Sequence, residues 1–408
     1  MTCRVSFSFM EPDKMPIPTL LLDLDDTLLD TNVDEFVPAY FKALSDALAD
    51  VVSPEVMLPA LMSGTKAMMA NRDPARTLQE VFDAVFFPRL GTERAVLQAR
   101  IDEFYETGFP KLQGVTRTRP EAVAFVEWAL AAGYRLAVAT NPFFPLRAVQ
   151  HRLHWAGLPV EEYDFALVSS YETFHFTKES VAYFPEVLGQ LGWPDAPAVM
   201  VGNDLQMDLL PARQAGLPVF WVGGQELPGE ELPHGSLSGL RQWLERTDPA
   251  SLMPAFDSPA AILACMTATP AVLDSLTRPL PPEGWKCNPE PGEWCLTEIL
   301  CHLRDVEREV NLPRLNKILA EDNPFLTAAV SDAWVSERQY ARQDGRQALT
   351  EYTSARKEAV GLLASLKEEW LKPARHAIFG PTTLKEQSSI LAGHDRAHVQ
   401  QVWKTIGR

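Results

Sequence analysis

Five short apolar runs within the first 223 residues constrain the fold of this chain more than any other feature. Each run is almost continuously apolar and ends in polar residues; the runs are 19–25, 134–140, 165–170, 198–203 and 218–223. Strands that are buried on both faces of a parallel sheet have this pattern, with helices in the intervening segments. The pattern therefore predicts an α/β domain, and ligands are expected at the carboxyl ends of its strands.

The segment between the first two runs breaks this alternation. Residues 33–115 contain amphipathic helical patterns, such as 33–51 and 74–90, and no convincing strand. We therefore expect an all-helical insertion directly after the first strand, a cap that would lie over the strand ends as a lid.

The pattern changes again after residue 245, where a last helix with a serine cap (235–245) is predicted to end. Residues 246–259 contain three prolines and indicate a linker. Every later segment is predicted to be helical, with a kink at Pro313 and a break near Gly345; the predicted helices are 258–277, 294–320, 331–368 and 382–405. These helices predict a four-helix bundle. The expected boundaries are a front domain 1–247, a linker 248–257 and a bundle 258–408.

Length and charge support two domains in a soluble protein. The 408 residues exceed the roughly 250–300 at which a single core stops growing. A formal net charge of −17 disfavours nucleic acid and anionic membranes as partners. No apolar run approaches the roughly 20 residues of a membrane helix, so no membrane span is expected.

Two further features concern the compartment. The first 14 residues lack the apolar region and cleavage site of a signal peptide, so we expect an unstructured extension there. The five cysteines are odd in number and lack CxxC spacing, which disfavours a disulfide framework. Both features favour a cytoplasmic location.

Polar residues follow the predicted strands at their carboxyl ends. They are Asp23 and Asp25, Thr140 and Asn141, Lys178 at the start of the next helical pattern, and Asn203, Asp204 and Asp208. Two carboxylates directly after a buried strand are costly unless a cation or a reaction requires them. The candidates therefore belong to one edge of the predicted sheet.

The order of these motifs, DxDxT, then Thr, then Lys, then GNDxxxD, resembles the haloacid dehalogenase superfamily over about residues 19–245. The resemblance implies a Rossmann-like sheet with a helical cap, and it implies roles for single residues. Asp23 would be the nucleophile that forms an aspartyl-phosphate, and Asp25 the general acid and base. Asp25 also argues against dehalogenation, because the members that dehalogenate lack this acid.

The resemblance also implies a phosphate site and a cation site. Thr140, with Asn141 and the adjacent amides, would hold phosphoryl oxygens, and Lys178 would neutralise charge on the nucleophile. Mg²⁺ would lie between the Asp23 carboxylate, the Asp25 main-chain carbonyl and Asn203.

Asn203 departs from the family pattern, which has an acid there. An amide oxygen still binds Mg²⁺ but brings no charge, so a lower affinity is expected. Asp204 or Asp208 would compensate as a further Mg²⁺ ligand, directly or through water. A decayed, inactive site is the alternative.

Substrate choice would depend on the cap. Lys66, Arg72 and Arg76 are candidate contacts for a distal anion of a small phosphorylated metabolite, with Arg117 and Arg119 as further options. The alternative for each is an ordinary solvated charge.

Three histidines of the C-terminal part have metal-like settings. His394 and His398 are four residues apart, so a helix presents both on one face, and His302 lies on another predicted helix. Three imidazoles with an open position suit Zn²⁺ or Ni²⁺. His376 is expected on a solvated connection rather than as a fourth ligand.

The segments EWCLTEILCHLRDVE and HDRAHVQQV resemble the DinB/YfiT-type four-helix bundles over about residues 256–408. In that family the three matching histidines bind a divalent metal, and Trp294 matches a recurrent tryptophan. Some relatives transfer thiol cofactors, and many have no known activity. A purely structural metal site stays open as an alternative.

The resulting prediction is a Mg²⁺-dependent phosphatase fused to a metal-binding bundle. A metal-dependent thiol transferase with a vestigial front domain is the second hypothesis. A third treats the bundle as an interaction module, with a homodimer as one option. Phosphoryl mutase activity is a fourth, and nothing in the cap argues for it.

Overall fold

The structure is a computed structural model that describes residues 16–225 and 232–408. The extension predicted for the first 14 residues lies outside the described residues, as does Cys3. The four cysteines within the described ranges, Cys265, Cys287, Cys295 and Cys301, are free thiols.

The front part contains the predicted parallel sheet. Its strand order is β5-β4-β1-β6-β7-β8, and all the pairings are parallel. The strands are β1 Thr19–Leu22, β4 Arg135–Val138, β5 Phe165–Val168, β6 Ala198–Gly202, β7 Val219–Val222 and β8 His234–Gly235. Every residue of β1 is buried between β4 and β6, because its apolar side chains face helices on both sides. The five predicted runs are confirmed as strands, and the short β8 was not predicted.

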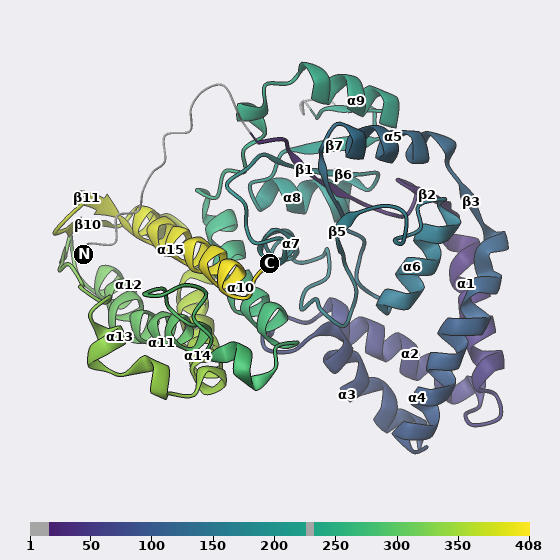
Figure 1. The fold of residues 1–408 in the computed structure, drawn as a ribbon, viewed down its shortest axis with the longest axis horizontal. Coiled ribbons are helices and arrows are strands. Elements are labelled where there is room, and N and C mark those ends of the chain that lie inside the picture. Colours follow the sequence, from purple (N-terminus) through teal and green to yellow (C-terminus); the bar gives the residue numbers. More distant parts are fainter. Residues whose placement is uncertain (1–15, 226–231) are drawn as a thin grey trace.

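Helices cover this sheet, with α5 and α9 above it in Figure 1 and α7 toward the bundle. They are α5 Pro120–Ala131, α6 Leu146–Trp155, α7 Tyr183–Gln190, α8 Leu210–Gln214 and α9 Leu237–Arg246. The serine cap predicted for the last of them is present, since the Ser236 hydroxyl accepts a hydrogen bond from the Gly239 amide.

The cap is helical, as predicted, and forms a separate group of helices at the lower right of Figure 1. Its elements are α1 Val33–Leu48, α2 Pro54–Met69, α3 Leu78–Leu90 and α4 Arg94–Glu103, followed by irregular helical turns to Val115. Two short antiparallel strands, β2 Leu29–Thr31 and β3 Thr116–Thr118, pair where the chain leaves and re-enters the front part.

The bundle lies on the opposite side of the molecule (Figure 1). Its helices are α10 Pro259–Thr277, α11 Leu296–Val306, α12 Leu312–Ala320, α13 Trp334–Glu337, α14 Gly345–Ala364 and α15 Leu384–Thr405. A π-helical turn (Glu307–Asn311) separates α11 from α12 just before Pro313, where the kink was predicted. The break at Gly345 is also confirmed.

The prediction that every segment after the linker is helical is wrong. A three-stranded sheet in the order β11-β10-β9 closes one end of the bundle. Its strands are β9 Phe325–Leu326, β10 Pro373–His376 and β11 Gly380–Thr383. Gly380, with φ +74°, and Pro381 disfavour a helix and permit the tight turn into β11.

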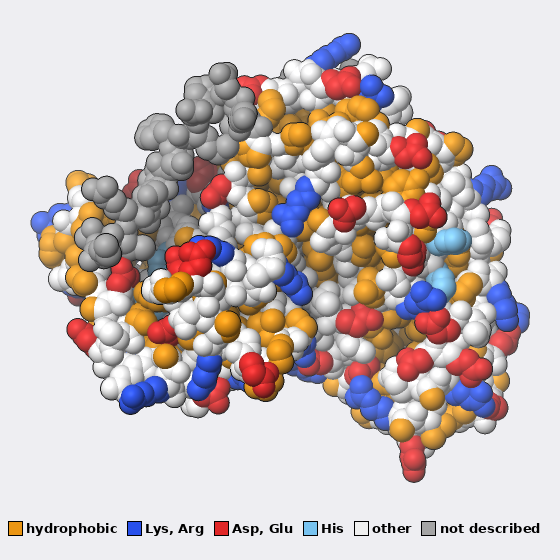
Figure 2. Space-filling view, in the orientation of Figure 1, with side chains coloured by type: hydrophobic (Ala, Val, Ile, Leu, Met, Phe, Trp, Pro, Cys, Tyr) orange, Lys and Arg blue, Asp and Glu red, His pale blue; other side chains and the backbone are white. Residues whose placement is uncertain are grey.

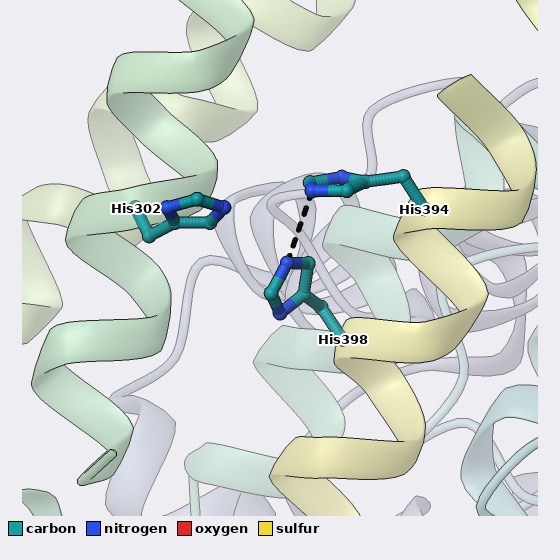
Figure 3. A group of neighbouring side chains, drawn as sticks. All are labelled: His302, His394 and His398. Atoms are coloured by element: carbon teal, nitrogen blue, oxygen red, sulfur yellow. Dashed lines mark hydrogen bonds between the residues drawn. The ribbon is translucent and has the colours of Figure 1, made fainter. Parts of the chain in front are cut away.

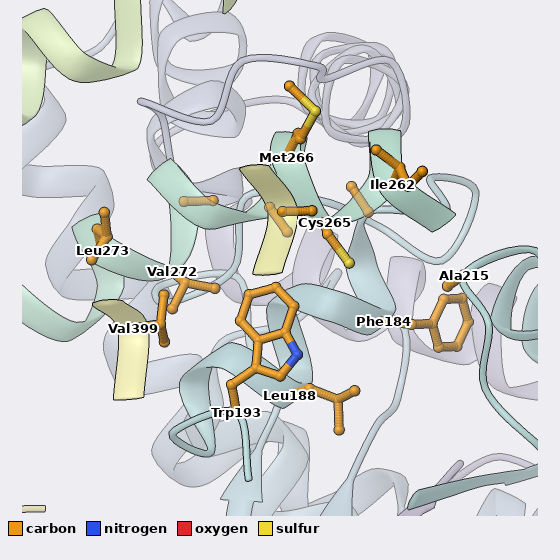
Figure 4. Packing of buried hydrophobic residues seen from close by; sticks show 14 of the residues in the cluster. Phe184, Leu188, Trp193, Ala215, Ile262, Cys265, Met266, Val272, Leu273 and Val399 are labelled. Atoms are coloured by element: carbon orange, nitrogen blue, oxygen red, sulfur yellow. The ribbon is translucent and has the colours of Figure 1, made fainter. Parts of the chain in front are cut away.

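One hydrophobic core extends from the front part into the bundle (Figure 4). Trp193, which follows α7, lies among side chains of both parts, and Val272 and Val399 reach it from α10 and α15. The predicted linker is packed as well, because the amide of Ala255 donates to the carbonyl of Gly216 at 2.8 Å. The two parts are therefore joined by a packed, apolar interface rather than by a free tether.

Helix α10 is the centre of this interface. Its mean hydropathy is 1.4, and by length and composition alone it could cross a membrane, which the sequence prediction did not single out. However, 72% of the 18-residue window with this hydropathy is buried inside the molecule, as in a core helix.

On the face drawn in Figure 2, basic and acidic side chains are interspersed.

Candidate functional site

The predicted nucleophile and its lysine meet at the carboxyl end of β1. Lys178 Nζ donates to Asp23 Oδ1 at 2.5 Å and to Asp208 Oδ1 at 2.5 Å. Lys178 and Asp208 are almost fully buried, and Asp23 is 6% exposed. One ammonium thus bridges two carboxylates that come from different strand ends, which is the convergence expected for parallel strands.

The charges of this triad are set by burial and by each other. Burial alone would lower the pKa of Lys178, but the carboxylates of Asp208 and Asp23 outweigh it and raise this pKa. Burial and the charge of Asp23 raise the pKa of Asp208, against the opposite effect of Lys178. The lysine is therefore cationic and placed to offset negative charge beside Asp23.

Asn203 is linked to Asp23 through the hydroxyl of Thr27. The Thr27 hydroxyl is 3.3 Å from Asp23 Oδ2 and 3.2 Å from Asn203 Oδ1. A hydroxyl has one proton, so it satisfies only one of these two oxygens at a time. The side-chain oxygens of Asp23 and Asn203 thus flank one point from two strand ends. Oxygen ligands of this kind fit a hard cation such as Mg²⁺.

Asp208 is held differently from the other predicted cation ligands. Its Oδ1 accepts from Lys178, and its Oδ2 accepts from the amide of Asp204 at 3.1 Å. Both oxygens therefore already have donors, and the ligand role predicted for Asp208 stays a prediction.

The second predicted strand end contributes backbone and an amide. The Thr140 carbonyl accepts from Ser169 Oγ at 2.7 Å and from the Tyr183 hydroxyl at 2.8 Å. Asn141 Oδ1 accepts from the amide of Lys178 at 3.2 Å. These bonds tie the end of β4 to the loop that carries the lysine.

Asp25 has a partner that the sequence prediction missed. Arg152 of α6 forms an ion pair with Asp25 Oδ1 while only 3% exposed. Its guanidinium lies over the rings of Phe36 from the cap and Phe144, at 5.1 and 5.7 Å from their centroids. Burial lowers the pKa of Arg152 to about 10. A pattern could have indicated it, since Arg152 is three residues after Val149 on the apolar face of the helix.

Two of the predicted cap cations lie on helix α2 and just after it. Lys66 is exposed on α2, and the Arg72 guanidinium donates to the carbonyls of Met69 and Asn71 at the end of the same helix. Their role in substrate binding stays a prediction. Arg119 lies instead in an open hollow of about 590 Å³ that Asn203 also lines, and it donates to the Asp26 carbonyl.

The three predicted histidines of the bundle converge (Figure 3). One ligand atom from each of His302, His394 and His398 lies within 4.8 Å of the others. The Nε2 atoms of His394 and His398 are 3.1 Å apart, and Nδ1 of His302 is buried without a hydrogen-bond partner. Imidazole nitrogens that face one another, beside a buried nitrogen without a hydrogen-bond partner, fit a bound cation.

Burial sets the protonation of this cluster. It lowers the pKa of all three imidazoles to about 3, and repulsion from a neighbouring histidine adds to the effect. The rings are therefore neutral near pH 7, which is the form that binds metals. His398 Nδ1 contacts Gln401 Oε1 at 2.8 Å, an arrangement that orients the ring with Nε2 toward the cluster.

Trp294 forms a wall of the histidine cluster, a placement that the sequence prediction did not specify. Its ring centroid is 5.0 Å from that of His302 and 6.2 Å from that of His398. Trp294 also lines an open hollow of about 780 Å³, together with the acidic residues Glu290, Glu293, Glu298 and Asp332. His376 is not part of the cluster, as predicted. The prediction that it is solvated is wrong, because it is buried at the end of β10.

Comparisons with known proteins give two matches that divide the chain. Residues 17–216 match the haloacid dehalogenase-like hydrolases, and residues 266–402 match the DinB superfamily. No curated protein matches the chain. The predicted fold class and the resemblance to both families are therefore confirmed.

Three solved structures are each similar to one part of the chain. A 2-haloacid dehalogenase from Pseudomonas syringae pv. Tomato DC3000 is 27% identical, with 57% of this chain and 99% of that chain covered and a TM-score of 0.42. A phosphatase of the same superfamily from Thermococcus onnurineus is 21% identical, with 56% and 98% covered and a TM-score of 0.35. YfiT from Bacillus subtilis, a probable metal-dependent hydrolase, is 16% identical, with 37% and 87% covered and a TM-score of 0.34.

Proposed function

We propose that this chain, in which a haloacid dehalogenase-like hydrolase region precedes a DinB-like bundle, is a Mg²⁺-dependent phosphatase of a small phosphorylated metabolite. The observation that carries the proposal is the contact of Lys178 Nζ with both Asp23 and Asp208 at 2.5 Å. A buried lysine beside a carboxylate at a strand end supports a nucleophile whose negative charge must be offset as it meets an anionic substrate.

The residues divide the reaction into two steps. A carboxylate oxygen of Asp23 attacks phosphorus while the ester P–O bond breaks, and Asp25 gives its proton to the leaving oxygen. Asp25 then takes a proton from water, whose oxygen attacks the phosphoryl group and releases Asp23. Asp23, Asn203 and the main-chain carbonyl of Asp25 would hold Mg²⁺, which supplies positive charge beside the phosphoryl oxygens.

The decisive test is Asp23→Asn in the full chain. We expect the wild-type protein with Mg²⁺ to release phosphate from a generic aryl phosphate, and the variant to lose at least about 1,000-fold in kcat. The amide has nearly the same shape, so an unchanged melting temperature shows that only the nucleophile is gone. Equal phosphate release by both proteins would exclude Asp23 as the nucleophile.

We also propose that the bundle binds a divalent transition metal through His302, His394 and His398. The expected result for His394→Ala is loss of the metal that purifies with the wild-type protein, measured by elemental analysis of dialysed samples. His154→Ala is the matched control, because His154 is exposed on α6 and distant in sequence from the cluster. Equal metal content in both variants would show that His394 is not a ligand of the metal. The thiol-transferase and interaction-module hypotheses stay predictions.

A further inference from the structure

The loop that carries Lys178 has no regular structure of its own. Residues 171–178 lie between β5 and α7 and contain neither helix nor strand, yet the five residues 174–178 are all buried. Buried backbone without a helix or sheet ladder must find its hydrogen-bond partners elsewhere. The position of Lys178 therefore depends on the segments that surround this loop.

The front part and the cap supply some of these partners. The Glu186 carboxylate of α7 accepts from the amides of His175 and Phe176, at 2.9 and 3.2 Å. From the cap, the amide of Leu78 donates to the Phe174 carbonyl at 2.8 Å, and Asn71 Nδ2 donates to the His175 carbonyl at 2.8 Å. These contacts hold the loop on two sides.

The third side is held by the bundle. Asp274 Oδ2 of α10 is 3.1 Å from Nε2 of His175, and Ser275 Oγ donates to the Thr173 carbonyl at 2.6 Å. His175 is fully buried and Asp274 is 24% exposed, so their contact is partly shielded from water. Because the ring also contacts Glu186 through Nδ1 at 2.8 Å, this one imidazole joins α7 to α10.

Helix α10 is placed closely enough to act as a fixed support. A Cβ atom added at Gly189 of α7 would lie 2.3 Å from Cγ2 of Val272, so the two helices touch at a position where only glycine fits. Arg278 at the end of α10 then contacts Asp274 at 2.6 Å and Glu80 of the cap at 2.6 Å. The same helix thus contacts the loop and the cap.

We infer that the bundle contributes positioning residues to the front site: Asp274 and Ser275 of α10 fix the loop 171–178 and, through it, the ammonium of Lys178. The inference rests on the proposed phosphatase function. Lys178 contacts Asp23 and Asp208 at 2.5 Å, so a displacement well below 1 Å changes both contacts. Misplacement by about 1 Å can cost on the order of 100-fold in rate. The bundle therefore supports the front site by holding the loop that carries Lys178.

Asp274→Ala in the full chain tests this inference. We expect kcat for the aryl phosphate to fall at least about fivefold with little change in KM, because the lysine acts chiefly in the transition state. Asp274→Asn keeps an oxygen that accepts from His175 and should restore kcat to within about twofold of the wild type. Asp195→Ala is the matched control, since Asp195 makes an exposed ion pair across the same interface with Arg396 at 3.0 Å.

Hydrogen exchange of residues 171–178 gives a readout that needs no activity. We expect faster amide exchange in Asp274→Ala than in the wild type or Asp195→Ala, at temperatures well below unfolding. Wild-type exchange and wild-type kcat in Asp274→Ala would overturn the inference, as would an equal loss of kcat in Asp195→Ala. If the wild-type chain releases no phosphate at all, the proposed function fails, and the exchange rates still decide whether α10 orders the loop.

Discussion

Asn203 stands at the position where the resembled family has an acid, and its oxygen lies 3.2 Å from the same hydroxyl that contacts Asp23. Compared with that family pattern, this position lacks one negative charge. At the same edge, the buried Arg152 contacts Asp25. One carboxylate fewer weakens the attraction of this edge for a cation and lowers its repulsion of an anionic substrate.

Restoring the acid should strengthen Mg²⁺ binding. For Asn203→Asp we expect the Mg²⁺ concentration for half-maximal phosphate release to fall roughly tenfold, equivalent to about 1.4 kcal/mol. Asn32→Asp is the control, because Asn32 caps α1 and an aspartate caps a helix equally well there. Titration of activity with Mg²⁺ checks both variants. An unchanged Mg²⁺ concentration for half-maximal activity in Asn203→Asp would show that this side chain does not bind the cation.

At the scale of elements, a buried charge network next to the histidine cluster joins the end of α11 to α14 and α15. Arg356 of α14 donates to Glu307 at 2.7 and 2.8 Å and also pairs with Asp395, the neighbour of His394. All three side chains are at most 1% exposed. Glu307 opens the π-helical turn before Pro313, so the irregularity and the network share a residue.

Removing the cation of this network should be costly. Arg356→Met leaves two buried carboxylates without their partner, and we expect the free energy of unfolding to fall by about 3–5 kcal/mol. Arg308→Met is the comparison, since Arg308 pairs with Glu351 while half exposed, and its loss should cost about 1 kcal/mol or less. Urea denaturation of the two variants measures the difference. Similar losses would mean that the buried network contributes no more than a surface pair.

At the scale of the whole molecule, the front part and the bundle share one core, and His175 lies at their junction with both ring nitrogens facing carboxylates. Burial alone would lower its pKa, but hydrogen bonds with Asp274 and Glu186 outweigh this and raise the pKa to about 9. The folded protein therefore holds a proton on His175 that the unfolded chain releases at a lower pH.

This raised pKa predicts how the junction responds to pH. The stabilisation by protonated His175 is complete below the ordinary value of 6.5 and is lost as pH rises to about 9. It amounts to at most on the order of 3 kcal/mol, from about 1.4 kcal/mol per pKa unit. We expect the free energy of unfolding of the wild type to decline over this range more steeply than that of His175→Gln. Parallel pH profiles would show that His175 does not carry the proton; Glu186, Asp274 and Arg278 are the other charged groups that face this junction.

The sequence by itself determined the order of the strands' polar ends and hence the meeting of Asp23 and Asn203, because parallel strands bring their carboxyl ends to one edge. It also determined the pairing of His394 with His398, since helical spacing places them on one face. The partners of those residues depended on tertiary structure. Arg152 beside Asp25, Asp274 beside His175 and the small sheet β9–β11 join segments far apart in the chain. A local pattern can mark a buried side chain such as Arg152, but it does not identify the partner, because such contacts arise only when packed elements bring buried polar groups to partners that satisfy them.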